Sequence, residues 1–252
     1  SWMSGEFAIT QSEPGLLGHD PELILAIRAK SIKDARKNME FIEKKIKRRT
    51  PVKIKSVTYK DFEINYVEMK GFFRLFFGKL FDKFEKPYYT YVDDYVVFSN
   101  KAASLLSFVE DYEQKNLLED TPGFKDAYSY MKSSSTIFLY TDMHKFYSQL
   151  KSMMNPATWN EIQSNKDVLY SFPYWTMQVV GDNQLASLQY VMDYRPYKPE
   201  EVTVVASDEE DEEMNEDAVT EKEQLSELKR FYVEKFEGNV LREFYPEGAL
   251  KS

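Results

Sequence analysis

The sequence predicts a mixed α+β fold, with a mostly antiparallel sheet and helices packed on one face. Tyr and Phe, which favour strands, number 18 each among the 252 residues. Apolar alternating segments joined by two-residue polar turns recur along the chain, as is typical of antiparallel hairpins. Because strands follow strands more often than they alternate with helices, the pattern favours α+β over a doubly wound α/β fold.

Six strands are expected in the first hundred residues, four of them paired as hairpins. They are residues 7–10, residues 22–30, the two halves of 53–69 and the two halves of 88–98. Lys60-Asp61 and Asp93-Asp94 supply the polar turns of the two hairpins. Ser31 is a favourable N-cap for a helix over 32–48, whose apolar residues recur at helical spacing.

Helices are more frequent after residue 100. A helix over 101–114 follows the second hairpin, and Pro122 marks the first turn of another that ends near residue 132. Asp142 is expected to cap a helix that directly follows a strand at 136–140. The remaining expected elements are a helix over 156–170 and strands at 174–180 and 185–194.

The chain divides into three parts by composition. Eight of the ten residues from Asp208 to Asp217 are acidic, and such a segment buries too little apolar surface to fold. The chain also opens almost directly on strand-like Phe7-Ala8-Ile9, so we expect a domain cut from a longer protein. The expected parts are an α+β domain over 1–197 that is truncated at its N-terminus, an acidic disordered linker over 198–222, and a short helix with a β-hairpin over 223–252.

Charge and cysteine content exclude several classes of function. The formal net charge is -9, and an acidic chain repels phosphate backbones, so nucleic acid is not an expected partner. The chain has no cysteine, which excludes disulfides, thiolate nucleophiles and Cys-ligated zinc. No apolar run approaches the roughly 20 residues that span a bilayer.

No group of residues has the spacing of a catalytic or metal site, so we expect neither an enzyme nor a cofactor. Asp93 and Asp94 are adjacent between two strands, which favours a turn over a carboxylate pair. His19 and His144 are the only histidines, and neither belongs to a Ser-His-Asp order or a His-x-x-x-His spacing. The acidic run lacks the central glycine and the alternating ligands of a calcium loop.

The most unusual segment is the Phe-rich stretch 71–84. On a helix its apolar side chains gather on one side, while Arg74, Lys79 and Lys83 lie elsewhere. Such a basic amphipathic helix usually packs on its own domain, and otherwise contacts a lipid, a membrane surface or a partner. The candidate contact residues are Phe72, Phe73, Phe76, Phe77, Leu80, Phe81 and Phe84.

A second aromatic group suggests a stacking platform for sugars or bases. Its members are Tyr88, Tyr89, Tyr91, Tyr174 and Trp175. Aromatic residues on strands more commonly form cross-strand packing pairs, and this interpretation is favoured.

Several stretches of residues 1–195 together resemble one known family. They are Trp2-x-x-Gly5-Glu6-Phe7-Ala8, the strand and helix at 23–46, the tract from Tyr91 to Ser99, the stretch from Leu117 to Phe124, and the segment from Ser135 to Tyr140. These features resemble the bacterial envelope family DUF3352, a domain of unknown function. That family has no assigned catalytic residues to transfer to this chain.

The tail carries a second resemblance. Gly238, the run from Arg242 to Gly248, and Leu250-Lys251 are similar to the start of a MORN-variant repeat over 231–252. Such repeats are tandem β-hairpins, and one unit depends on neighbouring units for stability.

Together these features predict a non-enzymatic binding or scaffold module. The resemblance implies a membrane-anchored protein of the cell envelope, with this part in the periplasm and an envelope protein as its partner. The alternative is a lipid- or membrane-surface-binding domain that uses the Phe-rich segment 71–84.

Overall fold

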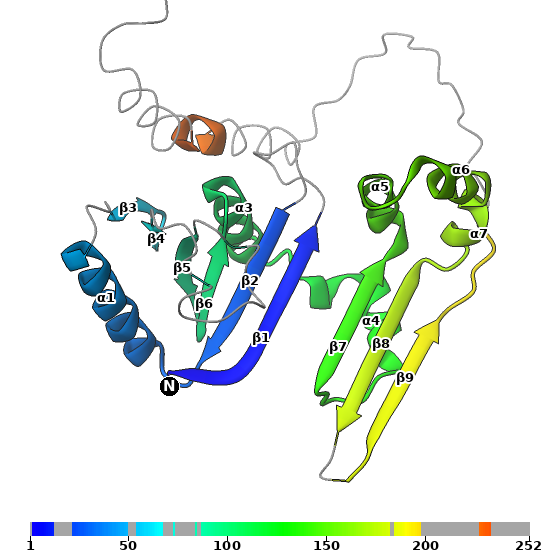
Figure 1. Cartoon of the computed structure of the whole chain (residues 1–252), viewed down its shortest axis with the longest axis horizontal. Helices are drawn as coiled ribbons and strands as arrows, with labels where there is room; N and C mark the ends of the chain where they lie inside the picture. Colours follow the sequence, from blue (N-terminus) through cyan, green and yellow to red (C-terminus); the bar gives the residue numbers. More distant parts are fainter. Residues whose placement is uncertain are drawn as a thin grey trace, which may run out of the picture. The chain divides into compact units, whose positions relative to one another are not determined.

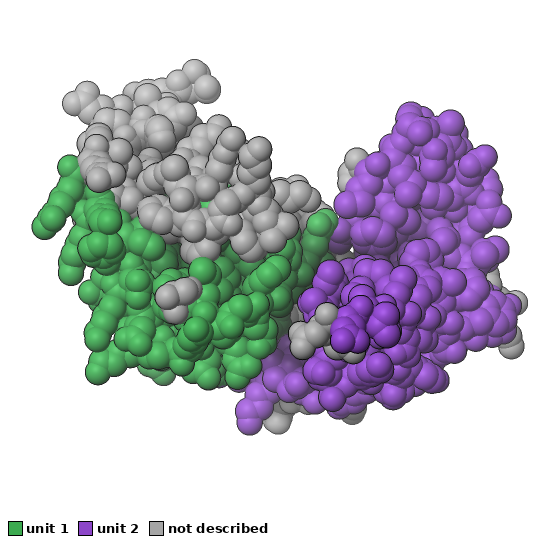
Figure 2. Space-filling model, turned by 60° about the horizontal axis from the view of Figure 1, so that its bottom comes forward, with its two compact units in different colours: residues 1–111, 212–252 green, residues 112–211 purple. Residues whose placement is uncertain are grey.

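The computed structural model describes the chain in several stretches. They are residues 2–12, 22–49, 54–67, 73, 84, 87–181, 184–197 and 227–232. Contacts divide the chain into two compact units, one formed by Ser1–Asp111 with Glu212–Ser252 and the other by Tyr112–Asp211 (Figure 2). The boundary near residue 111 falls inside the stretch 1–197, for which the sequence predicts one domain.

The first unit contains a six-stranded sheet in the order β1-β2-β6-β5-β4-β3 (Figure 1). Every neighbouring pair of strands is antiparallel. The strands are β1 (Met3–Ser12), β2 (Glu22–Ala29), β3 (Ile54–Tyr59), β4 (Phe62–Val67), β5 (Tyr88–Val92) and β6 (Tyr95–Ser99). The helices are α1 (Ile32–Arg49) and α3 (Ala102–Glu113), and residues 227–232 are also helical.

Both predicted hairpin turns are confirmed. Lys60 and Asp93 adopt left-handed backbone conformations, with φ of 49° and 48°, in the two turns. Strand β1 is longer than the predicted 7–10. It passes through an irregularity in register between Met3 and Phe7, where Gly5 has a φ of 99° that suits glycine.

One face of the six-stranded sheet packs on α1. Leu25 and Ile27 of β2 lie opposite Phe98 and Val96 of β6, and all four side chains are buried. Because directly paired residues share a face, this set forms a continuous apolar surface. Ala35 and Met39 of α1 complete this core cluster.

The opposite face is buried as well at its centre. Ile24 and Val97, which alternate with the residues of the first face, are almost fully covered. Tyr59 also points to this face, and its hydroxyl donates a 2.8 Å hydrogen bond to Glu110 of α3. The α+β class and the antiparallel sheet are confirmed, while α1 and α3 lie against opposite faces of this sheet rather than on the same one.

The second unit contains an antiparallel sheet in the order β7-β8-β9 (Figure 1). Its strands are β7 (Ile137–Asp142), β8 (Tyr174–Gly181) and β9 (Ala186–Met192). Its helices are a 3-10 helix η2 (Leu118–Asp120), α4 (Pro122–Ser129), α5 (Met143–Met153), α6 (Pro156–Ser164) and α7 (Lys166–Tyr170).

Local signals explain the helix ends in this unit. Asp142 caps α5 as predicted, since its carboxylate accepts hydrogen bonds from the amides of His144 and Lys145. The single helix predicted over 156–170 is instead two helices. Asn165 interrupts it with a non-helical backbone, and its side chain donates to the carbonyl of Glu161 at 2.8 Å.

The predicted parts after residue 197 lie almost entirely outside the described residues. The linker over 198–222 is one of these, and so is the hairpin beyond residue 232. Phe231 and Tyr232, which the sequence assigns to a strand, belong instead to the helical residues 227–232. The ring of Phe231 packs 4.8 Å from that of Tyr59.

We expect Glu110→Ala to lower the free energy of unfolding by about 1–3 kcal/mol. The substitution removes a buried carboxylate that accepts from the Tyr59 hydroxyl and pairs with Lys60 at 2.7 Å. Urea denaturation measures the change. Glu40→Ala, which removes an exposed pair with Lys44 at 3.8 Å, is the matched control and should shift stability by less than about 0.5 kcal/mol.

The first unit should also lose stability at alkaline pH. Burial raises the pKa of Tyr91 to about 12 from its ordinary 10. The folded state therefore retains the proton longer than the unfolded state, and stability falls as pH rises from about 10 to 12. Denaturation at several pH values should show a shallower decline for Tyr91→Phe. An identical decline in both proteins would contradict this assignment.

Candidate functional site

Two of the seven predicted contact residues are core residues. Phe73 is fully buried and Phe84 almost fully buried, and their ring centroids lie 5.4 Å apart. Phe73 also packs edge-on against Phe98 of the sheet at 4.8 Å. Buried rings cannot contact a membrane without leaving the core. Phe72, Phe76, Phe77, Leu80 and Phe81 lie outside the described residues.

Tyr88 and Tyr89 of the predicted aromatic platform point to opposite faces of the sheet. Tyr89 is buried in the core, where it donates a hydrogen bond to Glu43, and burial raises its pKa. Tyr88 lies on the other face of the sheet and stacks on Tyr66 at 4.4 Å. Tyr174, in the second unit, stacks on Tyr140 of the neighbouring strand at 6.0 Å. Tyr88, Tyr89 and Tyr174 therefore take part in cross-strand packing, the favoured interpretation.

The structure assembles a different aromatic cluster in the second unit. His144 of α5 stacks on Tyr170 of α7 at 4.3 Å, and Tyr147 meets Trp159 of α6 at 5.3 Å. Tyr170 also packs edge-on against Tyr197 at 5.1 Å. The rings cover one another and so tie α5, α6 and α7 together. Sequence spacing gave no signal for this cluster, since its members come from separate elements.

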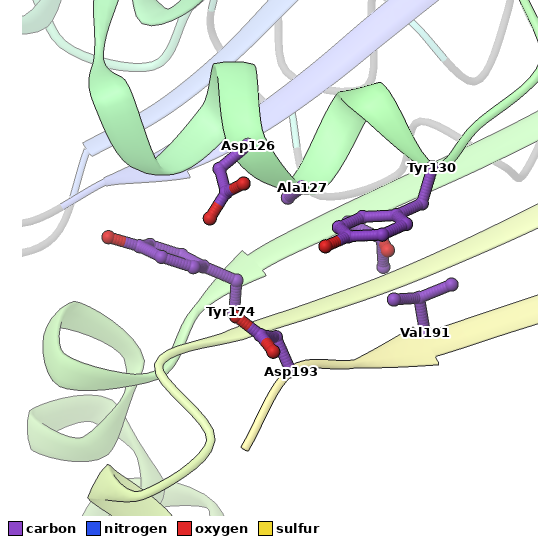
Figure 3. A pocket seen from close by; sticks show the side chains of 7 residues that line it. Asp126, Ala127, Tyr130, Tyr174, Val191 and Asp193 are labelled. Atoms are coloured by element: carbon purple, nitrogen blue, oxygen red, sulfur yellow. The ribbon is translucent and has the colours of Figure 1, made fainter. Parts of the chain in front are cut away.

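A small cavity lies between α4 and the three-stranded sheet (Figure 3). Its volume is about 10 Å³, which holds no more than one water molecule. Asp126 and Asp193 line it, and Arg195 forms an ion pair with each of these carboxylates. The cavity is too small for a substrate, and its two carboxylates are already paired with Arg195.

Within the described residues, no cluster of His, Asp and Glu side chains has the arrangement of a metal site. In the same residues, no helix is long and apolar enough to cross a membrane.

The most distinctive surface is one face of the three-stranded sheet. Strand pairing arranges its side chains in three cross-strand rows. The rows are Ile137-Val179-Leu188, Leu139-Met177-Tyr190 and Thr141-Trp175-Met192. Eight of these nine residues are apolar and none is charged, and we call the eight the apolar face.

Helix α4 covers the other face of this sheet and leaves the apolar face open. Phe124 of α4 packs edge-on against Phe138 at 6.2 Å and Tyr140 at 5.1 Å, both on the covered face. In Figure 1 α4 lies behind β7 and β8, and no described element of this unit stands in front of them. The large side chains on the two outer strands are between 44% and 67% exposed: Ile137 54%, Leu139 51%, Leu188 67%, Tyr190 50% and Met192 44%.

The covered face is more polar than the open one. Gln178 and Thr176 are each 1% exposed at its centre. The Gln178 amide exchanges hydrogen bonds with the backbone of Lys132, at 2.7 and 2.9 Å, which satisfies its donor and acceptor. Sheets normally bury their apolar face and expose their polar one. The inverted pattern indicates that the apolar face is built to be covered.

The described residues thus define an α+β protein of two antiparallel sheets, one of which leaves an apolar face uncovered. Residues 1–178 match the family described as "Protein of unknown function (DUF3352)", and the chain belongs to this family. The family expected over 1–195 is confirmed over the matched part, which ends within β8. The family comparison gives no support for a MORN-like repeat. No curated protein and no solved structure matches the chain.

We expect Leu188→Lys to reduce the fluorescence of a bound hydrophobic dye while changing the free energy of unfolding by less than about 0.5 kcal/mol. Leu188 is two-thirds exposed, so the charge interrupts the apolar face without entering a core. Val168→Lys is the matched control, because Val168 is 58% exposed on α7, away from this face. Equal dye loss in both variants would contradict the role of the apolar face.

Proposed function

We propose that this chain is a non-enzymatic binding or scaffold module of the cell envelope, and that the apolar face holds its protein partner. The observation that carries the proposal is the uncharged block of side chains on β7, β8 and β9, whose outer members on β7 and β9 are exposed. Contiguous apolar surface of this kind marks interaction sites on soluble domains. Burying one side chain such as Leu188 contributes about 1.5–3 kcal/mol.

A protein partner is favoured over a lipid. Residues 174–192, which form β8 and β9, contain no Lys or Arg that would attract anionic headgroups. The lipid alternative depends on the Phe-rich segment, and its two described rings, Phe73 and Phe84, lie in the core. The lipid alternative therefore requires the other predicted residues of 71–84 to contact the lipid. They are Phe72, Phe76, Phe77, Leu80 and Phe81.

The proposed location comes from the family resemblance. We propose that this part faces the periplasm as a portion of a membrane-anchored protein.

We also propose that the tail over 231–252 contains a MORN-variant repeat, with a hairpin that begins later than the sequence predicts. Because residues 227–232 are helical, any hairpin would begin after Tyr232. Such a repeat would place a second binding element beyond the acidic run and raise the effective concentration of a shared partner.

Site-specific photo-cross-linking tests the proposal in cells that carry the full-length protein. A photoreactive amino acid at Leu188 should give a protein adduct, and the same group at Val168 should not. Both positions are more than half exposed, so the comparison isolates the apolar face. A lipid adduct at Leu188 would support the alternative. No adduct, or equal adducts at both positions, would refute the proposal.

A further inference from the structure

The apolar face has the properties of a surface that binds another copy of itself. We propose that its occupant is a second copy of this chain, packed face to face as a two-fold symmetric dimer. The inference rests on the proposed function and names the partner of that surface. It depends on the area of the face, its charge and its shape.

The area fits a small stable dimer. The exposed fractions of the five large side chains on β7 and β9 correspond to roughly 600 Å², the upper end of what a typical monomer leaves open. Two such faces together would bury about 1,200 Å², which is the lower limit for specific interfaces.

The charge pattern permits self-association. The apolar face has no charged residue, so two copies meet without like charges in contact. Residues 112–197 contain seven Lys and Arg and nine Asp and Glu, a net charge of only -2 from the chain's total of -9. A charged partner would find no complementary group on this face.

The shape of the face suits an isologous contact. Two sheet faces pack about 10 Å apart when their side chains interdigitate. A two-fold axis along β8 places β7 of one copy over β9 of the other. The protruding Leu188 and Tyr190 then meet Ile137 and Leu139 of the second copy, while the lower Met177 and Val179 lie at the centre.

Sedimentation of the full chain over a range of concentrations tests the dimer. The wild type should pass from monomer to dimer, and Leu188→Asp should weaken dimerisation at least tenfold. Val168→Asp should leave it unchanged. Circular dichroism of each variant separates loss of association from loss of fold. A wild type that stays monomeric at all concentrations would overturn the inference.

Because the chain has no cysteine, single cysteines give an independent readout. A two-fold axis along β8 brings Met177 of the two copies face to face at the sheet separation of about 10 Å, which is too far for a disulfide. A bis-maleimide linker of about that length should therefore join two copies of the Met177→Cys variant, and it should not join copies of Val168→Cys. Failure of Met177→Cys to cross-link counts against the dimer.

The two proposals can fail separately. A cross-linked adduct at Leu188 that contains a different protein would overturn the dimer and leave the binding function standing. An adduct of twice the chain's mass supports both. Absence of any adduct at Leu188 refutes both.

Discussion

Alternation of side chains along antiparallel strands is the constraint on which the structure depends. Each strand presents two faces, so each sheet must bury both faces or leave one to water. The six-stranded sheet buries both at its centre, with Leu25 and Phe98 on one side and Ile24 and Val97 on the other. The three-stranded sheet buries the face under α4 and leaves the more apolar one open. The open apolar face follows from this unequal covering.

Local sequence signals predicted most of the elements because their physical causes are local. Asp142 supplies a cap, Asp93-Asp94 supplies a turn, and residues 23–27 are apolar enough to predict a central strand. The sequence pattern over 156–170 favours helix throughout and does not predict the break at Asn165. At this position the Asn165 side chain hydrogen-bonds to the carbonyl of Glu161 in the preceding turn, and such a bond competes with regular helical bonding. The division into two compact units near residue 111 has no signal in the sequence, because it depends on which sheet each strand joins and composition does not change there.

The candidate surface could not be found from the sequence for a related reason. Leu188, Tyr190 and Met192 alternate with more polar residues, which predicts an amphipathic strand with its apolar side toward a core. Only the position of α4 shows that this side is the open one. In the Phe-rich segment, an aromatic run is compatible with either a contact surface or a core. Its two described residues, Phe73 and Phe84, fill the core beside Phe98.

The strand order of the larger sheet has a kinetic consequence. Hairpins β3–β4 and β5–β6 close over two-residue turns and require little chain entropy. The central pairing of β2 with β6 joins Leu25 to Phe98 across more than seventy residues. The Ser99 hydroxyl adds a side-chain hydrogen bond to this pairing, because it donates to the carbonyl of Leu23 at 2.8 Å. Such distant pairing is slow relative to hairpin closure. The nascent chain therefore holds the largely apolar β2 without its central partner until β6 has been synthesised.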